Sequence, residues 1–72
     1  MSMQEQLEAL EHQIANAMKM VKSARSYVKV ATDNRCTSDA IERMKRNLCH
    51  CEGRLEGLRA AYEIMMLVGT EE

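Results

Sequence analysis

The fold is decided by residues 28–44, VKVATDNRCTSDAIERM, in which a polar stretch separates two apolar patterns. Residues 32–38 are the one interior run made of polar, turn-forming residues, so we predict a turn at about 34–38. Asn34 is expected to take the left-handed conformation that ends a helix. Thr37 or Ser38 is expected to cap the next helix, with Asp39 in its first turn.

Before the turn, apolar residues recur at alternating steps of four and three. This spacing predicts one helix over about 3–33 with a continuous apolar seam along one side. Ser2 and Glu5 fit a capping box at its start. The seam consists of Met3, Leu7, Leu10, Ile14, Ala17, Val21, Ala24, Val28 and Ala31.

After the turn, the same spacing predicts a second helix over about 39–68. We expect this helix to stop near Gly69 and to leave residues 70–72 frayed. Its seam consists of Ile41, Met44, Leu48, Cys51, Leu55, Leu58, Tyr62 and Met65.

A short turn makes the two helices antiparallel, so residues whose numbers add up to about 72 should lie level with one another. Val21 then faces Cys51, and Ala24 faces Leu48. The prediction is an all-α fold, a single antiparallel, coiled-coil-like helical hairpin over 1–72. Because two helices alone bury little apolar surface, we expect dimerisation or a helical partner to complete it.

The composition limits the function. A net charge of −1 argues against strong attraction to nucleic acid, and an aromatic share of 3% against both a β-sandwich core and base stacking. The longest apolar run, Ile64–Val68, is far shorter than the roughly 20 residues of a membrane span, and no secretory signal is expected. Three cysteines do not form a disulfide framework, which favours a reducing cytosol.

A second stripe runs along the second helix, on the side away from its seam. Two glycines in this stripe each cost the helix about 1 kcal/mol relative to alanine, which suggests that they allow close approach of another backbone. Neutral drift on a solvated face is the alternative. We expect the partner-binding residues to be Cys49, Gly53, Gly57, Ala60, Ile64 and Leu67, with Met66 and Val68 beside them. Met20 and Tyr27 either widen this surface or cover the edge of the core.

Charge is segregated along the chain. Residues 1–18 and 60–72 hold six acidic and no basic residues, whereas residues 19–46 hold eight basic and three acidic ones. A hairpin therefore has an acidic end and a basic end, which suits antiparallel self-pairing. The basic residues, Lys19, Lys22, Arg25, Lys29, Arg35, Arg43, Lys45 and Arg46, could also contact phosphates, although a solvated face is the more common role of such a run.

The sequence Cys49-His50-Cys51 contains residue types that bind zinc. On a helix, however, residues two apart point to nearly opposite sides, so these side chains do not converge and no metal site is expected. Cys51 is interpreted as a small core residue, and Cys36 as an exposed loop thiol.

No catalytic motif is present, and Glu5, Glu8 and Glu11 fall on polar sides of the first helix, where they interact with its dipole and aid solubility. We therefore expect no enzymatic activity, no catalytic residues, no cofactor and no small-molecule substrate.

The chain resembles the small YscE/EscE-type proteins of bacterial type III secretion. The resemblance covers nearly the whole chain and includes the start Gln4-Glu5-Gln6-Leu7, two equal helices about a polar turn, and the closing segment Ala60-Ala61-Tyr62-Glu63-Ile64-Met65-Met66-Leu67-Val68-Gly69. It implies a cytoplasmic bacterial co-chaperone that binds a helical-repeat chaperone and helps to keep the needle subunit from polymerising. The outer stripe of the second helix would then be its partner surface.

Two functions remain open. The leading one is a protein-binding hairpin that grips a helical partner, either another protein or a second copy, as a secretion co-chaperone would. The alternative is a ROP-like dimeric four-helix bundle that binds RNA through basic helix faces, or a phage regulator of similar build.

Overall fold

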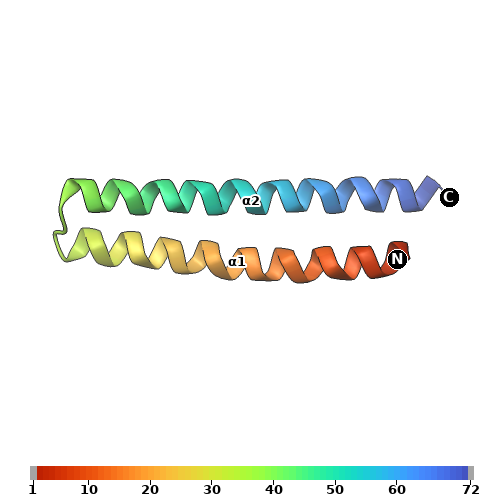
Figure 1. Ribbon diagram of the computed structural model, residues 1–72, viewed down its shortest axis with the longest axis horizontal. Helices are drawn as coiled ribbons and strands as arrows, with labels where there is room; N and C mark the ends of the chain where they lie inside the picture. The colour runs from red at the N-terminus through yellow and green to blue at the C-terminus, as the bar shows by residue number, and fades with distance from the viewer. Residues whose placement is uncertain (1, 72) are drawn as a thin grey trace.

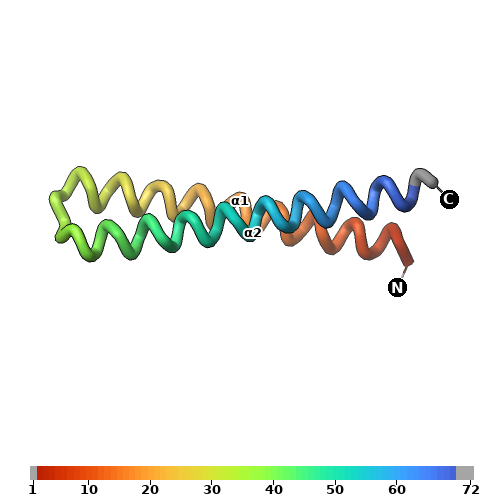
Figure 2. Tube along the Cα trace, turned by 90° about the horizontal axis from the view of Figure 1, so that it is seen from above, coloured from red at the N-terminus to blue at the C-terminus, as the bar shows by residue number. Residues whose placement is uncertain are grey.

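The computed structural model describes residues 2–71, with side-chain environments for residues 2–69. Helix α1 spans Met3–Asp33 and helix α2 spans Ser38–Glu71, and residues 34–37 join them. The helices run antiparallel in a rod of 54 × 15 × 14 Å, with both termini at the end opposite the turn (Figure 1). Seen from above, they cross near the middle of the rod (Figure 2). The all-α hairpin predicted from the sequence is confirmed.

The two seams lie against each other. Every seam residue of both helices is buried or half-buried. Val21, Ala24 and Cys51 form the central cluster, with Leu48 and Leu55 packed against it. The cluster brings Val21 to Cys51 and Ala24 to Leu48, as expected from the register in which the numbers of facing residues add up to about 72.

Side-chain caps fix the start of each helix. The Glu5 backbone N–H donates to Ser2 Oγ at 3.2 Å, which is the serine half of the expected capping box. At the second helix, the Ala40 N–H donates to Thr37 Oγ1 at 3.3 Å. Thr37 is therefore the N-cap of α2, and Ser38 is its first residue.

The turn closes α1 with a Schellman motif. The Cys36 N–H donates to the Ala31 carbonyl at 3.0 Å, and the Arg35 N–H donates to the Thr32 carbonyl at 3.2 Å. The left-handed residue is Arg35, with a φ of 56°, whereas Asn34 has a φ of −87°. Helix α1 ends at Asp33 as predicted, which makes Asn34 the C-cap. The expectation for Asn34 was wrong because the left-handed residue of a Schellman motif is the one after the C-cap, which is Arg35.

Arg35→Gly is expected to stabilise the hairpin. A side chain in the left-handed region costs roughly 1–2 kcal/mol, and the greater freedom of glycine in the unfolded chain offsets part of that gain. We expect a net gain of about 0.5–1 kcal/mol and a melting temperature several degrees higher by circular dichroism. Arg35→Ala keeps the Cβ and should give no gain. Equal melting temperatures for Arg35→Gly and Arg35→Ala would contradict this account of the turn.

Helix α2 does not stop where the sequence suggested. It begins at Ser38 and continues to Glu71, so Gly69 is not a terminator and residues 70–71 are helical, while residue 72 lies outside the described residues. The φ of Gly69 is not positive, so it does not take the left-handed conformation of a helix-ending glycine. A glycine inside a helix carries a moderate cost but does not by itself end the helix.

Candidate binding surfaces

The core is thin. Its buried hydrophobic residues are small ones, Ala17, Val21, Ala24, Ala31 and Cys51, and no side chain among the described residues is below 2% exposure. The large seam residues, such as Leu48 and Leu55, are only half-buried. A two-helix seam is open along both sides, so the hairpin retains exposed apolar surface.

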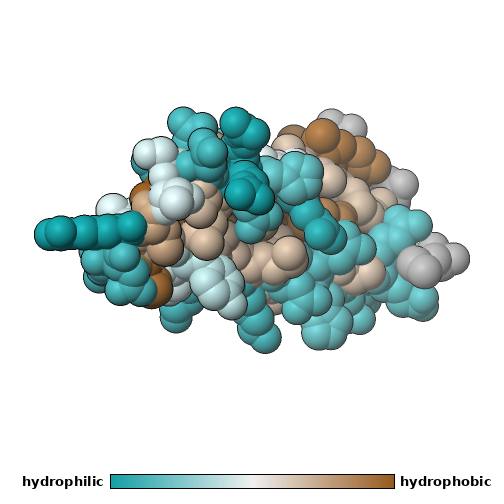
Figure 3. All heavy atoms as spheres, turned by 60° about the vertical axis from the view of Figure 1, so that its left-hand side comes forward, coloured by the Kyte–Doolittle hydropathy of each residue, from teal (hydrophilic) through white to brown (hydrophobic). Residues whose placement is uncertain are grey.

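The expected partner-binding residues of α2 are exposed. Ile64 and Leu67 retain 62% and 67% of their accessible surface. A Cβ added at Gly53 or Gly57 would have nothing within 4 Å, so within the hairpin nothing packs on either glycine. Apolar side chains gather at the end of the rod near the C-terminus, on the face shown in Figure 3. With Ala60, these residues form an accessible strip on the outer half of α2.

One of the expected residues, Met66, lies apart from that strip. Cys49 is exposed and lies one turn before Gly53, so it continues the strip into the half of α2 nearer the turn, where it lines a shallow depression with Glu42, Lys45 and Arg46. Met66 follows Ile64 by two residues, which places it about 200° away around the helix. Val68, by contrast, is one turn beyond Ile64 and lies beside it.

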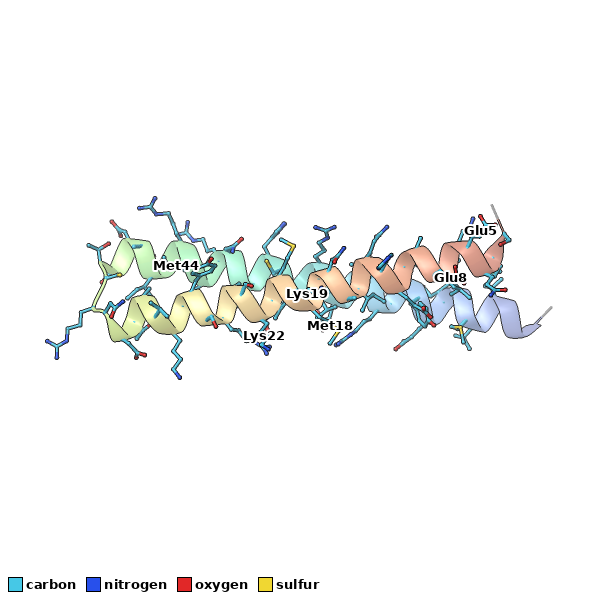
Figure 4. All side chains as sticks on the ribbon, turned by 90° about the horizontal axis from the view of Figure 1, so that it is seen from below. Glu5, Glu8, Met18, Lys19, Lys22 and Met44 are labelled. Atoms are coloured by element: carbon cyan, nitrogen blue, oxygen red, sulfur yellow. The ribbon has the colours of Figure 1, made fainter. Side chains whose placement is uncertain are left out.

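A basic groove runs along one side of the hairpin. It has a volume of about 640 Å³ and an apolar floor of Met18, Val21 and Leu55. Its other lining residues include five cations and no acidic residue: Lys19, Lys22, Arg25, Lys29 and Arg59. Figure 4 shows Met18 and Lys22 on the same edge of α1, with Glu5 and Glu8 toward the other end of the rod. The groove can therefore attract anionic groups.

Two polar contacts bridge the helices. Arg25 Nη2 lies 3.4 Å from Glu52 Oε2, at the edge of the basic groove. Near the termini, the Tyr62 hydroxyl donates to Glu11 Oε1 at 2.7 Å. This hydrogen bond raises the pKa of Tyr62, and partial desolvation and the Glu11 charge raise it further. Glu11 was predicted only to lie on a polar side of the first helix, although the register in which residue numbers add up to about 72 places it level with Tyr62.

The Tyr62 bond predicts a pH dependence. Because the pKa of Tyr62 is higher in the folded state, its contribution is fully present below the unfolded value of about 10 and is lost as the pH rises through the folded pKa. In a Tyr27→Phe background, absorbance near 295 nm reports Tyr62 alone. We expect Glu11→Gln to lower the pKa measured this way. An unchanged titration after Glu11→Gln would show that the bond is absent in solution.

The three cysteines lie in different environments. Cys51 is buried in the seam, as expected, whereas Cys36 and Cys49 are exposed. Among the residues that the structure describes, no three His, Cys, Asp or Glu side chains are placed to hold a metal ion. In the same part of the chain, neither helix has an apolar stretch long enough to cross a bilayer.

Comparison with known proteins gives no match: no protein-family model fits the chain, and no curated protein or solved structure is significantly similar to it.

Proposed function

We propose that the protein is a non-enzymatic interaction module that binds a helical partner through the outer strip of α2. The observation that carries this proposal is the exposure of Ile64 and Leu67 next to two glycines with open space above them. An apolar strip beside backbone without side chains offers a partner helix both buried area and close approach.

The resemblance to type III secretion co-chaperones gives the proposal a specific form. The partner would be a helical-repeat chaperone in the bacterial cytoplasm, and the complex would keep the needle subunit unpolymerised. The similar lengths of the two helices, 31 and 34 residues, and the exposed apolar end of α2 support this form.

The test is affinity capture of the tagged full-length chain from its native cell, with two variants. Gly57→Leu fills the open space on α2 and improves helix propensity, so the chain should stay helical while partner binding falls at least about tenfold. Ala15→Leu adds the same side chain to an exposed position of α1 and should leave binding unchanged. A helical partner retained equally by both variants would count against the outer strip of α2.

The basic groove supports a second candidate, RNA binding through phosphate contacts, because its lining holds five cations and no acidic residue. In this case the chain should bind RNA with an affinity that falls steeply with salt, and replacement of Lys22 and Arg25 by Glu should abolish that binding. A chain with no salt-dependent RNA binding would end this candidate.

A further inference from the structure

Helix α1 carries an exposed stripe without a single charge. We call it the uncharged stripe, and it consists of Gln6, Ala9, Gln13, Asn16, Met20, Ser23, Tyr27 and Val30, all exposed and spaced three or four residues apart. The other exposed positions of α1 include all eight of its Asp, Glu, Lys and Arg residues. A solvated face would carry some of these charges, whereas a helix-packing face excludes them because desolvation of a charge is costly.

The stripe is the α1 half of a wider face. Met20, Ser23 and Tyr27 line one groove with Lys19 and Asn47, and Tyr27 lines a second groove, of about 400 Å³, with Ala40, Arg43 and Met44. Asn47, Arg54, Ala61 and Val68 recur every seven residues, so in this coiled-coil-like hairpin they lie along the same side of α2. Of the residues that line these two grooves, only Lys19 also lines the basic groove, whose other lining residues lie on a different side.

We propose that this face pairs with the same face of a second copy, in antiparallel orientation, to form a four-helix bundle. The proposal rests on the proposed function in that both treat the hairpin as an incomplete bundle. It goes further by naming the partner and by using α1 as well as α2.

The register of the stripe supports a second copy. The midpoint of Met3–Asp33 is residue 18, so an antiparallel pair that overlaps along the whole of α1 places residue n level with residue 36 − n. Ala9 then lies level with Tyr27 of the second copy, and Asn16 with its Met20. Each large side chain of the stripe thus faces a smaller one, as close packing requires.

The second helix pairs in the same way. At matching levels, Ala61 and Val68 lie over the half of the second copy that contains Ala40 and Asn47. That half carries the groove of about 400 Å³, and Val68 would cover it. Val68 of each copy therefore meets a hollow in the other.

The charges toward the two ends of the rod and the area of the face favour the same arrangement, whereas Arg54, at the midpoint, lies level with Arg54 of the second copy. Residues 1–18 carry three acidic and no basic residues and residues 19–46 carry eight basic ones, so an antiparallel pair places the acidic end of one rod beside the basic end of the other. A parallel pair would place like charges together. The rod is 54 Å long and 15 Å wide, a face of roughly 800 Å², which is the area that each partner buries in a stable complex of standard size.

The first test uses two neighbouring methionines as a matched pair. Met20 lies in the stripe and is 50% exposed, whereas Met18 lies in the basic groove and is 49% exposed. By light scattering, the parent chain and Met18→Glu should have twice the chain mass of 8.2 kDa, while Met20→Glu should have 8.2 kDa and remain helical. A parent chain that stays at 8.2 kDa at all concentrations would overturn the proposal, as would a Met20→Glu chain that still forms dimers.

The second test fixes the orientation. In a background with Cys36→Ser, Cys49→Ser and Cys51→Ala, chains with Ala9→Cys and chains with Tyr27→Cys are mixed and treated with a short bismaleimide. An antiparallel pair cross-links the two kinds of chain to each other but neither to itself, because equal positions lie about 27 Å apart along the axis. Cross-linking of each kind to itself would show a parallel pair and contradict the proposal.

The two proposals can fail separately. If Gly57→Leu loses its partner in the capture experiment and the parent chain forms no dimer, the proposed function is supported and self-pairing is contradicted. If the parent chain forms a dimer that Met20→Glu disrupts, and no other helical partner is captured from the cell, self-pairing is supported and the co-chaperone hypothesis is contradicted.

Discussion

Ala24→Asp is expected to abolish the hairpin. Ala24 is 4% exposed and lies in the central cluster with Val21 and Cys51. An unpaired carboxylate in such a position costs roughly 3–5 kcal/mol. A domain of this length has a total stability of roughly 4–11 kcal/mol, and a core made of small residues belongs at the low end of that range. Circular dichroism at 222 nm should therefore show loss of most helical signal at neutral pH.

The matched control is Ala15→Asp. Ala15 is on the same helix but exposed, so the same substitution should cost only the difference in helix propensity, under about 1 kcal/mol. Equal melting temperatures for the two variants would mean that Ala24 is not enclosed between the helices.

Leu55→Ala is expected to have the second largest effect. Leu55 is half-buried and packs on the central cluster, so truncation should cost about 2 kcal/mol, the low end of the range for leucine. Leu67→Ala makes the same change at a residue that is 67% exposed, and its cost should stay below about 0.5 kcal/mol. Chemical denaturation of both variants gives the two free energies of unfolding.

The comparison of Leu55→Ala with Leu67→Ala also shows whether another chain covers the hairpin in solution. If both variants lose the same stability, Leu67 is covered in solution by something other than its own chain. A loss for Leu67→Ala that grows with chain concentration would identify the cover as another copy.

Most of the fold could be predicted from the sequence because the fold follows from the periodicity of the apolar residues. Steps of three and four residues set the seams, and one polar stretch set the turn, so Val21 and Cys51 could be paired in advance. The details that were predicted wrongly depend on single residues. The end of α1 at Asp33 agrees with the prediction, but the left-handed position is the residue after the C-cap, Arg35, whereas residue type favoured Asn34.

The candidate surfaces could be predicted from the sequence only in part. The outer strip of α2 could be predicted from the spacing of its residues. Met66 was included in the prediction because it is close to Ile64 and Leu67 in sequence, although helix geometry places it on another side of α2. The uncharged stripe of α1 was visible only as Met20 and Tyr27 seven residues apart. Its remaining positions are polar or small, so a search for apolar residues passes over them, and the absence of charge is the signal that identifies the stripe.

The fold-back of the chain underlies every proposal, and a distance between the two ends tests it most directly. Gln4 and Glu63 are exposed on different helices near the termini. Spin labels at these positions, in a background without the native cysteines and diluted with unlabelled chain, report the intramolecular distance by pulsed electron resonance.

A hairpin places the two labels within about 25 Å, because packed helices lie 8–10 Å apart and the labels add their own length. One continuous helix would separate them by roughly 90 Å. A single distance peak below 25 Å is the result expected here, and a peak near 90 Å would contradict the hairpin and the surfaces inferred from it.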